Sequence, residues 1–563
     1  DVISEDIARA APADATGAVA PTRAAQHWAN TGRILNAAAW VATAPPRVHL
    51  VQITSFGCGP DAFVIDEIGE LLRHAGKSHT VLKVDDINNN GSLRLRVRSL
   101  LESLPRPKAS APAAPTCAAD GTDGNGTDAP AADGTNATTR FTEADRHRTI
   151  LVPFFSETYS PFIPVLLGLM GYKAHSLPPA DAESIDHGLR HANNEVCYPA
   201  TLVIGDFLRA LASGDYARDQ IALGLTQTGG QCRASSYLAL LKRALHNAGY
   251  ADVPVVSFGT ASGAVVNEQP GFHPRWRGNI RAFITGIIYA DHIAQMYYAT
   301  APREALADGA ARLRDSYIAA GAAAIGRRDI TALRHLLRRA AADFNGATAP
   351  DAAPVPRIGI VGEIYIKYNS VGNKNIVEWL ITQGVEPVVP PLIDFFLQEI
   401  PNRTYNRRAH LAHRTWLDWL DAIGYRLTRH YQKQLAADAS GFRHHHAGED
   451  IYTKAQAAAR ILSPAAQYGE GWLIAAELAG FAESGVPNAV CLQPFGCIAN
   501  HLVAKGIERR VRELYPRMNL LFLDLDSGTG EANLLNRLHF IVQNARDCAG
   551  DTEAANVGDF SHS

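Results

Sequence analysis

The stretch Val51-Gln-Ile-Thr-Ser-Phe-Gly-Cys58 decides how the chain is interpreted, because Val490-Cys-Leu-Gln-Pro-Phe-Gly-Cys497 matches it without a gap. Each copy has the pattern of a short buried strand that ends in Phe-Gly-Cys and continues into a helix. In an open parallel sheet, ligands bind at the edge where strands lead into helices. The repeat therefore predicts two α/β modules, each with a cysteine at that edge.

The similarity between the two copies continues beyond the cysteines. Each copy carries a second apolar strand that ends in acid, at 81–86 in the first copy and at 520–526 in the second. Asp85 and Asp524 lie at the same spacing after the cysteine of their copy (58 to 85, and 497 to 524). Arg98 and Arg537 also share one spacing from it (58 to 98, and 497 to 537). We therefore equate Asp85 with Asp524 and Arg98 with Arg537.

Short apolar strands alternate with amphipathic helices through most of the chain. This pattern predicts an α/β fold of Rossmann-like, doubly wound parallel-sheet domains with helical insertions. The segment rich in Pro, Ala, Gly and Asp cannot bury enough apolar surface to become ordered, so we assign it as a linker. The assigned segments are an N-terminal extension (1–47) that ends an upstream domain, a first Phe-Gly-Cys module (48–102), a disordered linker (103–140), an α/β domain (141–270), a helical segment (271–350) and an α/β domain (351–563) with a helical insertion (397–462).

Composition excludes several classes of protein. The formal net charge of −3 gives no electrostatic reason to expect nucleic acid or an anionic membrane as a partner. No apolar run approaches the length of a membrane span. Seven cysteines in 563 residues are too few for a disulfide scaffold, so we expect a reducing, cytoplasmic compartment. The chain begins with Asp1, and we expect it to be part of a longer protein.

Two further cysteines lie in settings similar to those of the repeat. Cys197 stands where a helix begins, and Asn193 or Asn194 is the expected cap of that helix. Cys232 follows a buried strand through a Gly-Gly turn, which lets the backbone approach a bulky ligand closely. A helix N-terminus favours the thiolate form that binds metal. We predict that four cysteines share one site: Cys58, Cys197, Cys232 and Cys497.

The spacing of these four cysteines indicates which metal they bind. Structural zinc sites usually draw their ligands in close pairs, and the chain has no C-x-x-C. Dispersed thiolates from different domains suit an iron–sulfur cluster, and [4Fe–4S] is the expected type, with a double cubane as the alternative. Zinc is the second choice of metal. The plain alternative is that all four are buried hydrophobic side chains. We assign that role to Cys491 inside its strand, and expect neither Cys117 nor Cys548 to be a ligand.

A polar segment at 362–375 leaves two interpretations open. It follows a strand and precedes a helix, and its polar residues either line a site or form a turn in contact with solvent. Neither a phosphate-binding G-x-x-x-x-G-K-[ST] loop nor an order of residues that specifies catalytic groups is present. The polar residues in question are Lys367, Tyr368, Asn369 and Asn373.

Several motifs together resemble one family. They are SFGCGPDAF, NNEVCYPA, TQTGGQCRASSY, GEIYIKYNSVGNKNIVEWL, GEGW and QPFGCIANH. As a set they are similar to the C-terminal half of the large CoA-substrate-specific enzyme activases, or acyl-CoA dehydratase activase-related proteins, over about 48–543. That half is similar in turn to 2-hydroxyglutaryl-CoA and other 2-hydroxyacyl-CoA dehydratase subunits and to double-cubane cluster reductases.

The resemblance implies an oxygen-sensitive iron–sulfur protein of anaerobic metabolism that belongs to a 2-hydroxyacyl-CoA dehydratase system. It would relay low-potential electrons from an ATP-dependent activase module, and ATP would bind that module, which this chain does not show. The resemblance places the cluster on Cys58, Cys197, Cys232 and Cys497. It implies the activase module, a dehydratase or an acyl-CoA as partners, and leaves a homodimer open.

Relay is one of three functions that we consider. The dehydratases themselves leave one iron of the cluster without a cysteine ligand, so that substrate can bind it. Four thiolates would bind all four irons of one cubane, and this favours electron relay. A cluster-based reductase or dehydratase with an open iron is the second hypothesis. A non-catalytic scaffold with a structural metal site, or with none, is the third.

Overall fold

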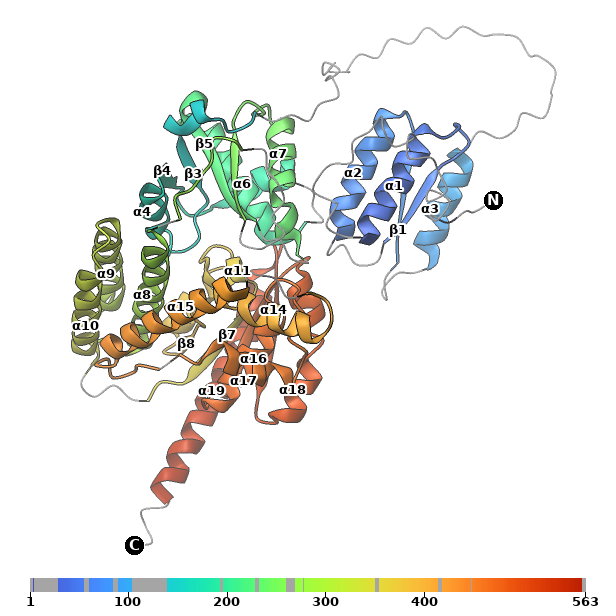
Figure 1. Ribbon diagram of the computed structural model, residues 1–563. Helices are drawn as coiled ribbons and strands as arrows, with labels where there is room; N and C mark the ends of the chain where they lie inside the picture. Colours follow the sequence, from blue (N-terminus) through green and yellow to red (C-terminus); the bar gives the residue numbers. More distant parts are fainter. Residues whose placement is uncertain are drawn as a thin grey trace, which may run out of the picture. The chain divides into compact units, whose positions relative to one another are not determined.

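The computed structural model describes residues 4, 29–54, 60–84, 90–103, 139–192, 196–227, 232–259, 269–276, 278–349, 354–413, 418–446 and 448–558. The chain divides into two compact units, Asp1–Thr138 and Thr139–Ser563, and both contain parallel β-sheet (Figure 1). The α/β prediction is therefore confirmed. The predicted linker lies almost wholly outside the described residues, and the boundary between the units falls within its range. Among the described helices, none is long and apolar enough to cross a membrane.

Unit 1 is a small module built around two parallel strands. Its elements are α1 (Ala29–Thr43), β1 (Leu50–Thr54), α2 (Pro60–His74), β2 (His79–Lys83) and α3 (Asn90–Ser103). The Lys77 ammonium, just after α2, donates to the carbonyls of Val41 at 2.5 Å and Ala44 at 2.7 Å, at the end of α1. A cation at a helix C-terminus stabilises the carbonyls left without partners there. Helix α1, which the sequence placed in an extension, is therefore attached to the first module.

Unit 2 contains two parallel sheets with the same strand order. The first is β4-β3-β5-β6 and the second is β8-β7-β9-β10, so each has the order 2-1-3-4 along its part of the chain. In such a sheet the order reverses between the first and third strands, and ligands bind at that point. The strands are β3 (Thr149–Val152), β4 (Lys173–Ser176), β5 (Ile221–Gln227), β6 (Val255–Gly259), β7 (Arg357–Gly362), β8 (Glu386–Val388), β9 (Asn488–Pro494) and β10 (Asn519–Leu525).

Helices surround both sheets of unit 2 (Figure 1). A shared hydrophobic core joins the second sheet to the long helices within 280–347 and to helices of the predicted insertion. Tyr289, Phe344, Leu435 and Trp472 lie in this core. Beside the first sheet are α4 (Phe162–Leu169), α5 (Ala182–His191), α6 (Tyr198–Ala212) and α7 (Tyr237–Asn247). The others are α8 (Ile280–Thr300), α9 (Gly309–Gly326), α10 (Ile330–Ala347), α11 (Ile364–Tyr368), α12 (Ile376–Thr382), α13 (Ile393–Leu397), α14 (Glu399–Arg408), α15 (Asp418–Ala439), α16 (Ile451–Ala459), α17 (Trp472–Glu483), α18 (Glu508–Leu514) and α19 (Glu531–Gly558).

The pairing of strands corrects the alignment of the internal repeat. Val51 lies opposite Thr80 in β1–β2, and its counterpart Val490 lies opposite Leu521 in β9–β10. The number of residues that separates two paired positions is therefore larger in the second copy (490 to 521) than in the first (51 to 80). The second copy has two more residues between its strands. Lys83, opposite Thr54, is therefore the counterpart of Asp524, opposite Gln493, so the equation of Asp85 with Asp524 was wrong; Asp85 itself lies outside the described residues.

An arginine contact supports the same correction. Arg96 of α3 donates to the carbonyl of Val81 at 3.1 Å, and Arg537 of α19 donates to the carbonyl of Phe522 at 2.6 Å. Both arginines lie 15 residues after the carbonyl that they bind (81 to 96, and 522 to 537). The counterpart of Arg537 is therefore Arg96 and not Arg98. The repeat itself is present as two strand–helix–strand–helix modules with one arginine contact in common.

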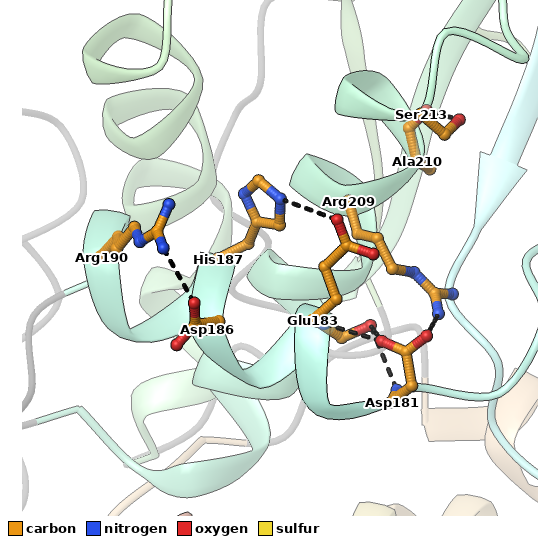
Figure 2. A network of polar contacts seen from close by, with 9 residues as sticks. Asp181, Glu183, Asp186, His187, Arg190, Arg209, Ala210 and Ser213 are labelled. Carbon is orange, nitrogen blue, oxygen red and sulfur yellow. Dashed lines mark hydrogen bonds and ion pairs between the residues drawn. The ribbon is translucent and has the colours of Figure 1, made fainter.

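Helices α5 and α6 are joined by close backbone packing and by polar contacts (Figure 2). Asp181 caps α5 by accepting from the Ser184 amide at 2.9 Å, and Arg209 of α6 donates to the same carboxylate at 2.5 Å. A Cβ atom added at Gly205 would lie 1.8 Å from the Ser184 carbonyl oxygen, so α6 approaches α5 at this glycine. These contacts fix the helix whose first turn follows Cys197.

Replacement of Gly205 by alanine is expected to destabilise unit 2 by about 3 kcal/mol or more, because the two backbones must separate. The matched control is Gly168→Ala in α4, where an added Cβ meets nothing within 4 Å. That change should be neutral or stabilising by up to about 1 kcal/mol, since alanine favours a helix over glycine. Urea unfolding followed by circular dichroism measures both variants. Equal midpoints for the two would contradict the close approach.

Candidate cysteine site in unit 2

Cys497 lies in a tight turn at the end of β9. Its amide donates to the Pro494 carbonyl at 3.0 Å, and Gly496 before it has φ of 77°. This left-handed conformation favours glycine, which explains the Phe-Gly-Cys sequence in physical terms. The Asn500 amide group, in the π-helical turn Ala499–Ala504, donates to the Cys497 sulfur at 3.2 Å. The thiol is buried and receives a hydrogen bond from a side chain three residues on.

Cys197 occupies the N-cap position of α6, with extended backbone angles. The sequence placed the cap at Asn193 or Asn194, and that assignment was wrong because the helix begins at Tyr198, directly after Cys197. The Cys197 sulfur lies 3.1 Å from the Tyr237 hydroxyl of α7. The Tyr198 amide donates to the Phe495 carbonyl at 3.2 Å, so the start of α6 is bonded to the Cys497 turn.

Cys232 follows β5 and caps a short 3₁₀ turn, Arg233–Ser236, that precedes α7. It is partly buried. The strand that leads to Cys232 is the third of the first sheet, and the strand that leads to Cys497 is the third of the second sheet. The two cysteines therefore occupy equivalent positions in two sheets of equal strand order, each beside the point where the order reverses.

Three of the four predicted ligands come together. Cys197, Cys232 and Cys497 all line one cavity of about 360 Å³ in unit 2. Each of them is a thiol rather than half of a disulfide. The three come from separate segments of the sequence, so the fold and not local sequence brings them together. Cys58 lies outside the described residues, and its membership of the site stays a prediction.

The electrostatic surroundings disfavour thiolates while no cation is nearby. Burial raises the pKa of Cys232 well above its ordinary value, and the nearby Cys197 raises it further. Burial likewise raises the pKa of Cys497, as do the Glu470 and Glu363 carboxylates, while the Asn500 hydrogen bond opposes this effect. A bound cation reverses this preference, because metal binding displaces protons from its ligands.

Two glutamates beside the thiols have no counterpart in the sequence-based prediction. Glu363 follows β7, lines the cavity and accepts from the Ile366 amide at 2.9 Å. Glu470 is buried and accepts from the Ile364 amide at 2.7 Å. Burial, followed by repulsion from Glu470, raises the pKa of Glu363 to about 8. Only the fold places these carboxyls together, since their positions are far apart in sequence.

The donor set fits an iron–sulfur cluster in its chemistry. Within the part of the chain that the structure describes, no three His, Cys, Asp or Glu side chains form a group that could hold a single metal ion. In a cubane each thiolate binds a different iron, so the ligands need not converge on one point. Three enclosed thiols, two of them with polar side-chain partners at 3.1 and 3.2 Å, are suited to such a group.

The remaining sequence-based assignments have mixed outcomes. Cys491 is buried within β9 and is absent from the cavity lining, as predicted for a packing residue. The four polar residues singled out in 362–375 are all buried, and none of them lines this cavity, so they neither face solvent nor belong to this lining: Lys367, Tyr368, Asn369 and Asn373. Lys367 pairs with Glu477 at 2.8 Å, and Asn369 donates to the Phe154 carbonyl at 3.1 Å, both out of contact with solvent. The start of this segment does line the cavity, through Glu363, Ile364 and Tyr365.

Asp206 is a further buried acid, on the same helix as Cys197. Burial raises the pKa of its carboxyl from 3.8 to about 7, although the Ser184 side chain and the Arg209 guanidinium act in the opposite direction. The folded protein therefore binds this proton more tightly than the unfolded chain does. The resulting stabilisation is complete below about pH 4 and is lost as the pH rises towards 7.

Asp206→Asn should remove this loss and raise the free energy of unfolding at pH 8 by about 2–4 kcal/mol, with little change at pH 4. Urea unfolding at both pH values measures the effect. The control Asp215→Asn changes an exposed carboxylate and should be neutral at both. A wild-type stability that is flat between pH 4 and pH 8, and equal to that of the Asn variant, would contradict the assignment.

A comparison of the sequence with protein-family models finds no match, and a comparison with curated proteins finds none either.

Proposed function

We propose that the chain is an iron–sulfur redox protein that holds a cluster on Cys197, Cys232 and Cys497. The single observation that carries the proposal is the placement of these three thiols, from distant segments, around one cavity. Cys232 and Cys497 follow strands at the sheet edges at which parallel α/β folds bind ligands, and Cys197 begins α6 beside them. A doubly wound, Rossmann-like arrangement of both sheets agrees with their strand order and is part of the proposal.

When bound, a [4Fe–4S] cluster supplies one-electron transfer at low potential. The protein residues set the conditions of that transfer. Asn500 donates to the Cys497 sulfur and Tyr237 contacts the Cys197 sulfur, and hydrogen bonds to ligand sulfur are one of the factors that set a reduction potential. The apolar surroundings limit the access of water. In the first form of the proposal the electrons come from an ATP-dependent activase module and pass to a 2-hydroxyacyl-CoA dehydratase in the cytoplasm.

The cavity favours a second candidate function, in which the chain is itself a reductase or dehydratase. Three cysteines as ligands would leave one iron of a cubane without a described ligand, and the cavity extends from the thiols to apolar residues of α4, α8 and α13. A relay needs no such space beside its cluster. Cys58 as the fourth ligand would favour relay, and an open iron beside the cavity would favour catalysis.

The test is anaerobic purification of the chain, followed by iron and sulfide assays and EPR after reduction. The proposal predicts a brown protein with iron and acid-labile sulfide in equal amounts and a low-potential EPR signal. A redox titration with and without an acyl-CoA then separates relay from catalysis, because only a substrate-binding cluster should change its signal. A colourless, iron-free protein after anaerobic reconstitution would reject both forms.

A further inference from the structure

The cavity beside the cysteines is larger than packing alone explains. Its volume of about 360 Å³ lies within the range of small-molecule sites. Native interiors contain few voids larger than a water molecule, because empty space forfeits dispersion contacts. Lining residues from α4, α8 and α13 extend the space away from the thiols: Phe162, Leu166, Phe283, Ile287, Phe395 and Phe396. The apolar part therefore provides room beyond that needed by a group held on the cysteines.

A row of aromatic rings connects this cavity to the protein surface. Trp276 lines the cavity and is 45% exposed, so the row ends in a ring that is also in contact with solvent. Its ring meets Phe283 edge to face at 6.0 Å, and Phe283 meets Phe396 in the same way at 5.5 Å. Aromatic rings in this arrangement form a rigid apolar wall. An exposed tryptophan at the end of such a row offers a first contact to an apolar molecule that enters.

The charge distribution decides which molecules the cavity can hold. Glu363 is the only acidic side chain among the described residues that line it, and no lysine, arginine or histidine is in that lining. A carboxylate or phosphate placed inside would have no cationic partner and would face Glu363. A neutral molecule avoids this cost, and a single polar end could bond to the Tyr237 hydroxyl or to Glu363, which lie in the lining with the cysteines.

We infer that the cavity binds one neutral, mainly apolar organic molecule, with an aromatic ring or a branched hydrocarbon chain, beside the three cysteines. In the second candidate function this molecule is the substrate, or the uncharged reacting part of one, and in that role it rests on the proposed function. The binding itself depends only on the lining residues. Any anionic portion of the molecule stays outside the cavity.

The experiment measures binding to the metal-free full-length chain with two probes of nearly equal shape. Phenylacetamide is neutral and phenylacetate is anionic. We expect phenylacetamide to bind at least about tenfold more tightly by calorimetry, because an unpaired buried charge is costly. We also expect phenylacetamide to change the tryptophan fluorescence through Trp276. Equal affinities for the two probes, or no binding of phenylacetamide, would overturn the inference.

Two variants locate the binding. Trp276→Ala should weaken phenylacetamide binding several-fold and remove most of the fluorescence change, whereas Trp419→Ala, at a tryptophan 54% exposed on α15, should change neither. Ala290→Leu fills space in the cavity lining and should also weaken binding. If Ala290→Leu does not fold, the surface variant Trp276→Ala decides alone. Unchanged binding in the folded variants would overturn the inference, and because no metal is present, this result is separate from any failure of cluster loading.

Discussion

Substitution of Cys232 by serine is expected to lower the affinity for iron by more than about 100-fold, so that the anaerobically purified chain loses its colour. Loss of a partner that merely supports a metal ligand typically costs about 10–100-fold in affinity, and loss of the ligand itself should exceed this. Cys232 lines the cavity with the other two thiols, and serine at the same position is a poor ligand for iron. Iron and sulfide assays on matched preparations measure the effect.

Matched variants make this prediction specific. Cys197→Ser and Cys497→Ser should behave like Cys232→Ser. Cys491→Ala removes another buried thiol, six residues before Cys497, that is absent from the cavity lining, and it should keep its iron. Asn500→Ala should retain a cluster but shift its midpoint potential downward, because the Cys497 sulfur loses a hydrogen-bond donor. Iron loss in Cys491→Ala equal to that in Cys232→Ser would indicate a general loss of folding and contradict the assignment.

Replacement of Lys367 by methionine is expected to destabilise unit 2 by about 3–5 kcal/mol, because it leaves a buried carboxylate without its partner. The Lys367 ammonium and the Glu477 carboxylate lie 2.8 Å apart, with only 4% and 2% of their side chains exposed. The second Glu477 oxygen has no hydrogen-bond partner among the described residues. Urea unfolding at pH 7 measures the change in the free energy of unfolding.

The double variant Lys367→Met/Glu477→Met should recover most of this loss, since a buried ion pair replaced by apolar side chains is often neutral in stability. The exposed pair Arg509–Glu513, with the arginine side chain 92% exposed, is the control. Arg509→Met should cost no more than about 0.5 kcal/mol. A Lys367→Met variant as stable as Arg509→Met would show that the buried pair contributes nothing to folding.

Much of the fold was predictable from the sequence because buried parallel strands have a strong local signal. The apolar run expected as a strand at 520–526, for example, forms β10 (Asn519–Leu525). The positions of Cys232 and Cys497 followed from the same signal, since each lies just after a strand, whereas Cys197 lies between two helices at the start of α6. The convergence of Cys197, Cys232 and Cys497 on one cavity agrees with the prediction of a shared site. The cluster itself stays a proposal.

The features that could not be predicted from the sequence depend on contacts between distant segments. Helix α1 and strand β4 have weak patterns, and β4 reads Lys-Ala-His-Ser, with no fully buried residue. Counting from the cysteine could not reveal the two-residue difference between the copies, because only strand pairing fixes the register. Glu470 and Tyr237 approach the site through tertiary packing alone. The spacing Phe-Gly-Cys-x-x-Asn, which places Asn500 three residues after Cys497, is the local signal for this hydrogen bond to sulfur.

The most direct test of the central claim is a crystal structure of the anaerobically purified full-length chain, with anomalous diffraction recorded on both sides of the iron absorption edge. The account predicts an iron peak within bonding distance of the sulfur atoms of Cys197, Cys232 and Cys497, at the end of the cavity that they line. The same map shows whether Cys58 supplies a fourth sulfur. Three unmodified thiols with no iron peak between them, in protein reconstituted with iron and sulfide, would contradict the account.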